Sequence, residues 1–396
     1  MNSILAGWII DGTGGPVQNH MLLQIKNGYI HHIRKAEQED FKIPGISDLS
    51  HCTILPGLID SHVHLFMSGT NDLCIRKHQL DAEFDDVKDV ISHHISQLLL
   101  FGIFAVRDGG DKNAHALRYK KNCLDITKTP ILLNVAGKAW HKPNRYGRLI
   151  GRTTSGSDTL SRAIEKDKEK ADIDHVKIVN SGINSLTRFG KETPPQFDLE
   201  EMTAAVKAAD RLGLKTMVHA NGKIPVRISA DSGCHSVEHG FFMGKDNLKR
   251  LADKNITWVP TAVTMKAYSE QLESTGPESD ISRKNLDHQL EQIFQARESG
   301  VTIALGTDAG SLGVFHGIAV IEEMKLLMES GFTIQEAVRC ATFNGAKLLD
   351  IIIQAGLLAR EMQATFIAVK GDPSMLPDSL MSVQKFYVNG ELVFEK

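Results

Sequence analysis

The feature that most constrains this fold is an alternation of short apolar runs with longer amphipathic stretches through the middle of the chain. Each run is rich in branched aliphatic residues and ends in polar ones, which is typical of buried strands. The runs cover residues 54–65, 104–110, 131–137, 175–182, 214–222, 234–240, 256–262 and 302–310. Eight strands alternating with helices predict an α/β fold with a parallel sheet, and a (β/α)8 TIM barrel accommodates this number.

An open, doubly wound sheet is the alternative to a barrel. Its first strand would normally lead into a glycine-rich turn that binds phosphate. Here the first run leads into His-Val-His-Leu, residues 62–65, instead. The sequence therefore favours the barrel.

The stretch between the runs at 175–182 and 214–222 shows the expected helical pattern. Asp198 and Glu201 have the spacing of a capping box, and Gly213 follows where a C-terminal glycine is expected. The apolar residues between them recur every three or four positions, at Met202, Val206, Ala209 and Leu212. This pattern predicts an amphipathic helix that packs one face against the sheet.

Both ends of the chain look β-rich. Asn27-Gly28 and Asn389-Gly390 each join two short apolar runs, which is a strong hairpin signal. We therefore expect residues 1–52 and 355–396 to pair into one small β-sandwich domain, and residues 53–354 to form the barrel.

Composition excludes several classes of protein. The 45 Lys and Arg against 48 Asp and Glu give a net charge of −3, which does not suggest a nucleic-acid partner. No apolar run approaches the roughly 18 residues that a membrane span needs, and no signal peptide is recognisable. The five cysteines include no Cys-x-x-Cys pair. A cytoplasmic protein acting on a small molecule is expected.

Imidazoles and a carboxylate stand where several strands end. His62 and His64 are two residues apart on one strand, so both face the same side. His219, His239 and Asp308 end three further strands, and the C-terminal ends of barrel strands meet at one face. Each histidine alone could be an ordinary core residue, but together they suit Zn²⁺ or a similar divalent ion.

Lys177 lies on the fourth strand and points toward the same site. Burial without a counter-charge would lower its pKa. A neutral amine near metal ions can add carbon dioxide to form a carbamate, whose two oxygens could bridge two metals. An ion pair with Asp308 or Asp174 is the alternative.

The chain resembles the amidohydrolase superfamily, in particular its imidazolonepropionase-like and prolidase-like branch. The matching motifs are PGLIDSHVHL, DHVKIVNSG, MVHANG, SVEHG and LGTDAG, in the family order, and the resemblance extends over both ends of the chain. It implies two divalent metal ions, zinc being expected, with a carboxylated Lys177 bridging them. The other implied ligands are His62, His64 and Asp308 for one ion, and His219 and His239 for the second.

The resemblance implies a hydrolase acting on a C–N bond of the amide type. Hydroxide bridging the two metals would attack the carbonyl, and Asp308 would act as general base and then as general acid. The alternatives are a mononuclear zinc deaminase or cyclic-amide hydrolase with unmodified Lys177, a prolidase-like dipeptidase, and a non-catalytic scaffold. The substrate and the number of subunits in a homo-oligomer stay open.

Residues for binding the substrate are sought in loops. The stretch 139–156 mixes basic, aromatic and glycine residues after the third strand, so His141 and Tyr146 are candidates for gripping a substrate. An ordinary surface loop is the alternative. Asn221, beside His219 and Ala220, departs from prolidase-like relatives at this position and is a third candidate.

Overall fold

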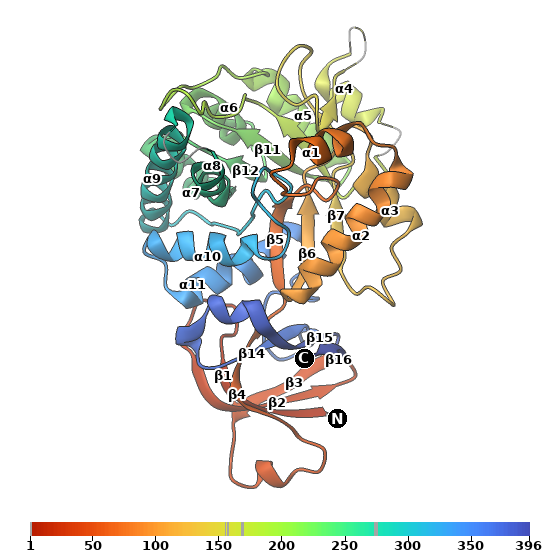
Figure 1. Ribbon diagram of the computed structural model, residues 1–396, viewed down its shortest axis with the longest axis vertical. Coiled ribbons are helices and arrows are strands. Elements are labelled where there is room, and N and C mark those ends of the chain that lie inside the picture. Colours follow the sequence, from red (N-terminus) through yellow and green to blue (C-terminus); the bar gives the residue numbers. More distant parts are fainter. Residues whose placement is uncertain (1, 155, 157, 168–169, 273–275) are drawn as a thin grey trace.

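The computed structural model describes residues 2–154, 156, 158–167, 170–272 and 276–396, and it has an α/β fold with parallel sheets. Figure 1 shows helices arranged around strands in one part of the molecule and a β domain at the other end. Both chain termini lie in that β domain (Figure 1).

The runs predicted as the first seven strands of the middle region all contain regular strands. Their bounds are β5 (Leu58–Val63), β6 (Ile103–Asp108), β7 (Leu132–Val135), β10 (His175–Val179), β11 (Lys215–Ala220), β12 (Ser236–His239) and β13 (Thr257–Val259). They belong to two parallel sheets, ordered β5-β6-β7 and β13-β12-β11-β10-β8-β9. The short strands β8 (Ala139–Trp140) and β9 (Gly151–Arg152) come from the segment 139–156, which was expected to be a loop. Residue 155 of that segment lies outside the described residues.

The eighth predicted strand, 302–310, is not a regular strand. It forms isolated parallel bridges, from Ile303 to Trp258 of β13 and from Ala309 to Val63 of β5. The ladder is interrupted because Asp308 adopts a left-handed backbone conformation, with φ of 57°. The segment nevertheless links the two parallel sheets. A second link lies at the opposite edge of the β5-β6-β7 sheet. There the backbone N–H of Asp174, directly before β10, donates to the carbonyl of Val135 in β7 at 2.9 Å.

Helices connect the parallel strands. The first six are α1 (Leu73–Asp81), α2 (Phe84–Leu100), α3 (His115–Asn122), α4 (Leu160–Glu165), α5 (Leu199–Arg211) and α6 (Lys223–Asp231). The others are α7 (Lys245–Asp253), α8 (Val263–Gln271), α9 (Pro277–Glu298), α10 (Ala319–Glu329), α11 (Ile334–Arg339) and α12 (Gly345–Leu349). Within the described part of the chain, no helix is both long and apolar enough to cross a membrane.

Helix α5 confirms the pattern predicted for it. The Asp198 side chain accepts from the backbone of Glu201, the Glu201 side chain accepts from the backbone of Asp198, and Gly213 has φ of 71°. Its apolar face is buried against the parallel sheet, as the 3–4 residue spacing predicted.

Strands from the two ends of the chain pair in one β-sheet. Its strands are β1 (Asn2–Ile9), β2 (Gln18–Lys26), β3 (Tyr29–Lys35), β4 (Ser47–Pro56), β14 (Phe366–Lys370), β15 (Val383–Val388) and β16 (Glu391–Glu395). Both predicted Asn-Gly hairpins are present, between β2 and β3 and between β15 and β16. The hydrogen bonds form one sheet, ordered β16-β15-β14-β4-β1-β2-β3, and not the two sheets expected of a sandwich. The reason is that β4 pairs on both edges, with β1 and with β14.

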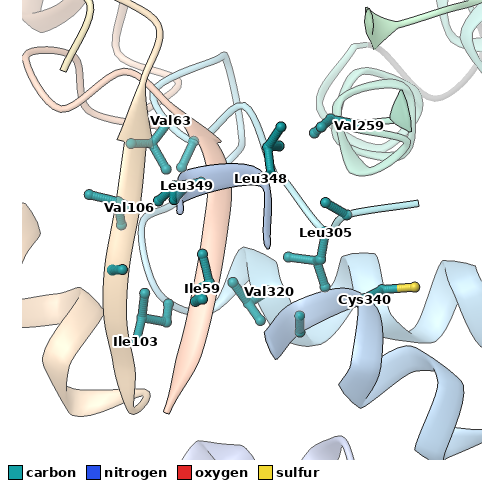
Figure 2. Close-up of a cluster of buried hydrophobic side chains, with 14 of the residues drawn as sticks. Ile59, Val63, Ile103, Val106, Val259, Leu305, Val320, Cys340, Leu348 and Leu349 are labelled. Atoms are coloured by element: carbon teal, nitrogen blue, oxygen red, sulfur yellow. The ribbon is translucent and has the colours of Figure 1, made fainter. Parts of the chain in front are cut away.

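A buried apolar cluster supports the strands that carry the site. Figure 2 shows Ile59 and Val63 of β5 facing Val106 and Ile103 of β6 on one side. Leu305 lies on the other side of the cluster, with Val320 of α10 and Leu348 of α12 (Figure 2). All of these side chains are buried, so they hold β5, β6 and the segment around Leu305 at fixed positions.

Candidate active site

The six residues predicted to bind metal all line one cavity. The cavity has a volume of about 260 Å³ and lies at the C-terminal ends of the parallel strands. The six lining residues are His62, His64, Lys177, His219, His239 and Asp308. They come from β5 and the residue that follows it, from β10, β11 and β12, and from the segment after Leu305. Segments far apart in sequence meet here because their strands are parallel neighbours.

His62, His64 and Asp308 form a tight group of potential ligands. Asp308 Oδ1 lies 3.5 Å from Nε2 of His62 and 3.5 Å from Nε2 of His64. One donor atom from each of the three residues lies within 4.8 Å of the others. Two imidazole nitrogens and one carboxylate oxygen, converging at one point, suit a divalent transition metal.

His219 and His239 lie beside this group. Their ring centroids are 4.5 Å apart, and the ring of His239 is 5.0 Å from that of His62. Other groups fix both rings, since Nδ1 of His239 lies 2.7 Å from Thr261 Oγ1 and Nε2 of His219 lies 3.1 Å from the carbonyl of Gly182. Each ring therefore keeps its second nitrogen for the cavity.

Lys177 is almost fully buried, with 1% of its surface exposed. Its Nζ has no hydrogen-bond partner among the described residues. Asp174, one predicted partner, instead accepts from Lys120 Nζ at 2.8 and 2.7 Å and from the backbone of Val135. Burial lowers the pKa of Lys177, so its neutral form becomes accessible. A buried amine without a partner is an expensive arrangement unless something else occupies the site.

The histidines of the cavity are held in the neutral form that binds metals. Burial lowers the pKa of His64 to about 4 and that of His219 to about 3, with Lys177 adding to the effect. Burial raises the pKa of Asp308. Neutral imidazoles keep the lone pair that a metal needs, so this donor set fits a cation.

A buried ion pair behind His62 was not predicted from the sequence. Glu238 Oε2 lies 2.9 Å from His62 Nδ1, and its other oxygen accepts from Arg107 Nη2 at 2.8 Å. Arg107 also donates to Ser61 O at 2.8 Å and to Ser236 Oγ at 2.9 Å. Because a carboxylate only accepts, Nδ1 of His62 carries the proton, and Nε2 faces Asp308 with its lone pair.

The three residues predicted to bind substrate have different surroundings. Tyr146 lines the cavity, with its ring 5.2 Å from that of His219. Asn221 also faces the site, but its Oδ1 accepts from the backbone of Phe241 at 3.0 Å, which ties two strand ends together. His141 is buried, and its Nδ1 lies 2.9 Å from the carbonyl of Lys142. It is not among the residues that line the cavity.

A second, smaller chamber of about 100 Å³ adjoins the first. The two chambers share lining residues, among them Tyr146, His219, His239, Tyr268, Asp308 and Ser311. Arg76 of α1 lines the first chamber, and Phe241 and Met265 line the second. Arg76 and Tyr268 lie far from any strand end in the sequence, so no motif pointed to them.

Gly109 lies directly against the histidine pair, which allows a specific test. A Cβ at this position would lie 2.7 Å from His64 Cε1 and 3.3 Å from His62 Nε2. We expect Gly109→Ala to displace the imidazoles and to lower metal affinity by about 10- to 100-fold, as loss of ligand positioning does. Metal titration with a competing chelator measures this.

The control for this variant is Gly15→Ala, whose Cβ would meet only Thr13 Oγ1, at 3.1 Å. We expect Gly15→Ala to bind metal as the wild type does. An unchanged metal affinity in Gly109→Ala would show that metal binding does not depend on the positions of His62 and His64.

Comparison with known proteins identifies the family of the chain and shows similar folds. The sequence model of the amidohydrolase family matches residues 53–393. The imidazolonepropionase of Thermoplasma volcanium is 23% identical to this chain, over 94% of this chain and 90% of its own. A crystal structure of a Xaa-Pro dipeptidase with methionine bound in its active site superposes with a TM-score of 0.83 at 25% identity, covering 100% of both chains.

A further solved structure shows a similar fold. The A. niger ochratoxinase has a TM-score of 0.79 at 19% identity and covers 99% of this chain and 95% of its own. The family match spans most of the sequence, and it includes every strand end that contributes to the cavity. The chain belongs to the amidohydrolase family of hydrolases.

Proposed function

We propose that this chain is a metal-dependent hydrolase that cleaves a C–N bond of the amide type in a small molecule. One observation carries the proposal: six potential ligands line a single cavity, and among them the buried Nζ of Lys177 has no partner in the described chain. Carboxylation of that amine would give it a charge and two oxygen ligands, and so would resolve the cost of its burial.

The proposed assignment of ligands follows the grouping in the cavity. His62, His64 and Asp308 would hold one divalent ion, zinc being the expected metal, and His219 and His239 would hold a second. The carboxylated Lys177 would bridge the two. Bound divalent ions would polarise the scissile carbonyl and lower the pKa of water toward neutrality.

Asp308 is the proposed general base and acid. Its Oδ2 accepts from Ser311 Oγ at 3.1 Å, and the carboxylate lies where both chambers meet. From there it can take a proton from the attacking water and deliver it to the departing nitrogen. Tyr146, beside His219, is placed to contact the substrate, and Asn221 shapes the neighbouring wall.

We also propose that the parallel strands close into a (β/α)8 barrel. The bridges from Ile303 and Ala309 on one side and the bond from Asp174 to Val135 on the other support closure. We propose that the barrel covers about residues 53–354 and that residues 1–52 and 355–396 form the β domain. Strand β4 continues to Pro56 within that β domain.

We also propose a cytoplasmic location.

The named relatives suggest two substrate classes. One is named for imidazolonepropionate, a cyclic amide, and another for Xaa-Pro dipeptides. The second candidate function is therefore a mononuclear deaminase or cyclic-amide hydrolase, in which Lys177 stays unmodified. Among the described residues, the group of three potential ligands within 4.8 Å of one another consists of His62, His64 and Asp308, which would suffice for a single ion.

A turnover screen tests the proposal. Purified protein loaded with zinc and bicarbonate would be assayed against N-acyl amino acids, dipeptides and cyclic amides. The proposal predicts hydrolysis of at least one open-chain amide, loss of turnover with chelator, and recovery with metal. Ring opening of a cyclic amide, which releases no ammonia, or release of ammonia from an added cyclic amidine, at one metal per chain would support the second candidate. No turnover of any compound by metal-loaded protein would contradict both.

A further inference from the structure

The backbone of His239 adopts an unusual conformation at the end of β12. Its φ is 66°, in the left-handed region that is costly for a residue with a side chain. Its carbonyl accepts from two fully buried side chains, Nε1 of Trp258 at 3.0 Å and Nε2 of Gln289 at 2.6 Å. Donors from outside the strand therefore hold the turn at this proposed metal ligand.

Gln289 holds a second peptide at the same time. Its Nε2 also donates to the carbonyl of Pro260 at 3.2 Å. Pro260 directly precedes Thr261, whose Oγ1 lies 2.7 Å from Nδ1 of His239. One amide group thus joins the backbone of His239 to the peptide that carries the hydrogen-bond partner of the His239 ring.

A row of polar residues on the buried face of α9 keeps Gln289 in place. Asn285, Gln289 and Gln292 are four and three residues apart, so they share one face of the helix. Gln289 Oε1 accepts from Gln292 Nε2 at 2.9 Å, and Gln292 Oε1 accepts from the backbone of Gly244 at 3.1 Å. Because carbonyls only accept, the nitrogen of the Gln289 amide must face His239 and Pro260, and its orientation is fixed.

We propose that Gln289 is a positioning residue for the metal ligand His239. By fixing the His239 backbone and Thr261 relative to each other, it directs Nε2 of His239 into the cavity. Gln289 is not among the residues that line either chamber, so it acts through His239 and not by contact with a metal or a substrate. The inference rests on the proposed function, since it concerns the metal that His239 would help to hold.

Metal titration of Gln289→Met tests the inference. Met fills nearly the same space but donates no hydrogen bond. We expect the ion that His239 helps to hold to bind about 10- to 100-fold more weakly, as loss of an outer-shell partner does. The affinity of the ion at His62, His64 and Asp308 should change by less than about threefold. Competition with a chelator measures both affinities, and in cobalt-loaded protein the visible absorption bands of the His239 site should change as well.

Asn247→Leu is the matched control. Asn247 of α7 is also a buried helix amide that donates to two backbone carbonyls, those of Lys223 and Met243, at 2.9 and 2.8 Å. It is not among the residues that line either chamber. Both Gln289→Met and Asn247→Leu should lower the urea midpoint of unfolding, because each removes a donor from two buried carbonyls. We expect only Asn247→Leu to bind metal as the wild type does.

A double-variant cycle separates positioning of His239 from general loosening of the fold. Thr261→Val removes the partner of the His239 ring and keeps the shape of the side chain. Since Gln289 and Thr261 are proposed to act on the same imidazole, the loss of metal affinity in the double variant should be about tenfold smaller than the product of the two single losses.

Two outcomes would overturn the role of Gln289. One is equal metal affinity in Gln289→Met and Asn247→Leu. The other is a loss in the double variant that equals the product of the single losses. Failure of the proposed function looks different: the wild type would bind a single ion, or would turn over no substrate. The comparison of Gln289→Met with Asn247→Leu would then still decide the role of Gln289 for the bound ion.

Discussion

Lys177→Ala is expected to abolish turnover, lowering kcat by at least about a thousandfold, and to leave at most one metal ion per chain. The reason is that the variant removes the proposed bridge between the two ions, together with the only amine in the cavity that lacks a partner among the described residues. Steady-state kinetics with metal analysis of the same samples measures both effects.

A chemical rescue separates loss of the bridge from loss of the fold. Truncation leaves space where the amine was buried, and a short carboxylate such as formate or acetate offers the two oxygens of a carbamate. We expect millimolar formate to restore part of the activity and the second metal of Lys177→Ala.

Lys120→Met is the matched control for Lys177→Ala. Lys120 pairs with Asp174 outside the cavity, with 30% of its side chain exposed. Loss of such a pair costs about 1 kcal/mol or less, so activity and metal content should stay those of the wild type. Full activity in Lys177→Ala would contradict the proposed role of this lysine.

Glu238→Gln is expected to weaken both the fold and the metal site. The carboxylate is fully buried between Arg107 and His62, and removing its charge leaves the Arg107 guanidinium buried without a counter-charge. Breaking a buried pair in this way costs about 3–5 kcal/mol of the free energy of unfolding. Metal affinity should also fall about 10- to 100-fold, because the single amide oxygen of Gln cannot accept from both Arg107 and Nδ1 of His62, and its NH₂ group cannot accept at all.

Denaturant unfolding and chelator competition measure the two effects of Glu238→Gln separately. Glu165→Gln is the control, since Glu165 pairs with Arg211 at the surface, where both side chains are at least 41% exposed. We expect that variant to change stability by less than about 1 kcal/mol. Unchanged metal affinity in a folded Glu238→Gln protein would show that Glu238 does not position His62.

The positions of the parallel strands could be predicted because branched apolar runs and helical stretches alternate so regularly. The convergence of His62, His219 and His239 followed from the same pattern, since parallel strands bring their C-terminal ends to one face. The eighth strand was predicted less well. Its apolar run looks extended, but the backbone at Asp308 is left-handed, with φ of 57°, and the ladder is interrupted there. The neighbouring Thr307 donates to the carboxylate of Asp60, a contact between residues 247 positions apart.

Other parts of the site could not be predicted, because they depend on where side chains meet across the fold. Glu238 and His62 are 176 residues apart, and only the packing of their strands shows that they touch. Arg76 lies in a helix whose path over the cavity no motif encodes. The same reason applies to His141, which was predicted to bind substrate. The segment 139–156 lies near the site, but the chain turns so that Tyr146 lines the cavity and His141 does not.

Anomalous diffraction from crystals of the zinc-loaded protein tests the central claim most directly. Two zinc peaks are expected, one among His62, His64 and Asp308 and the other at His219 and His239, with electron density extending beyond Nζ of Lys177 toward both. A single peak, with the density of Lys177 ending at its amine, would contradict the paired-metal centre.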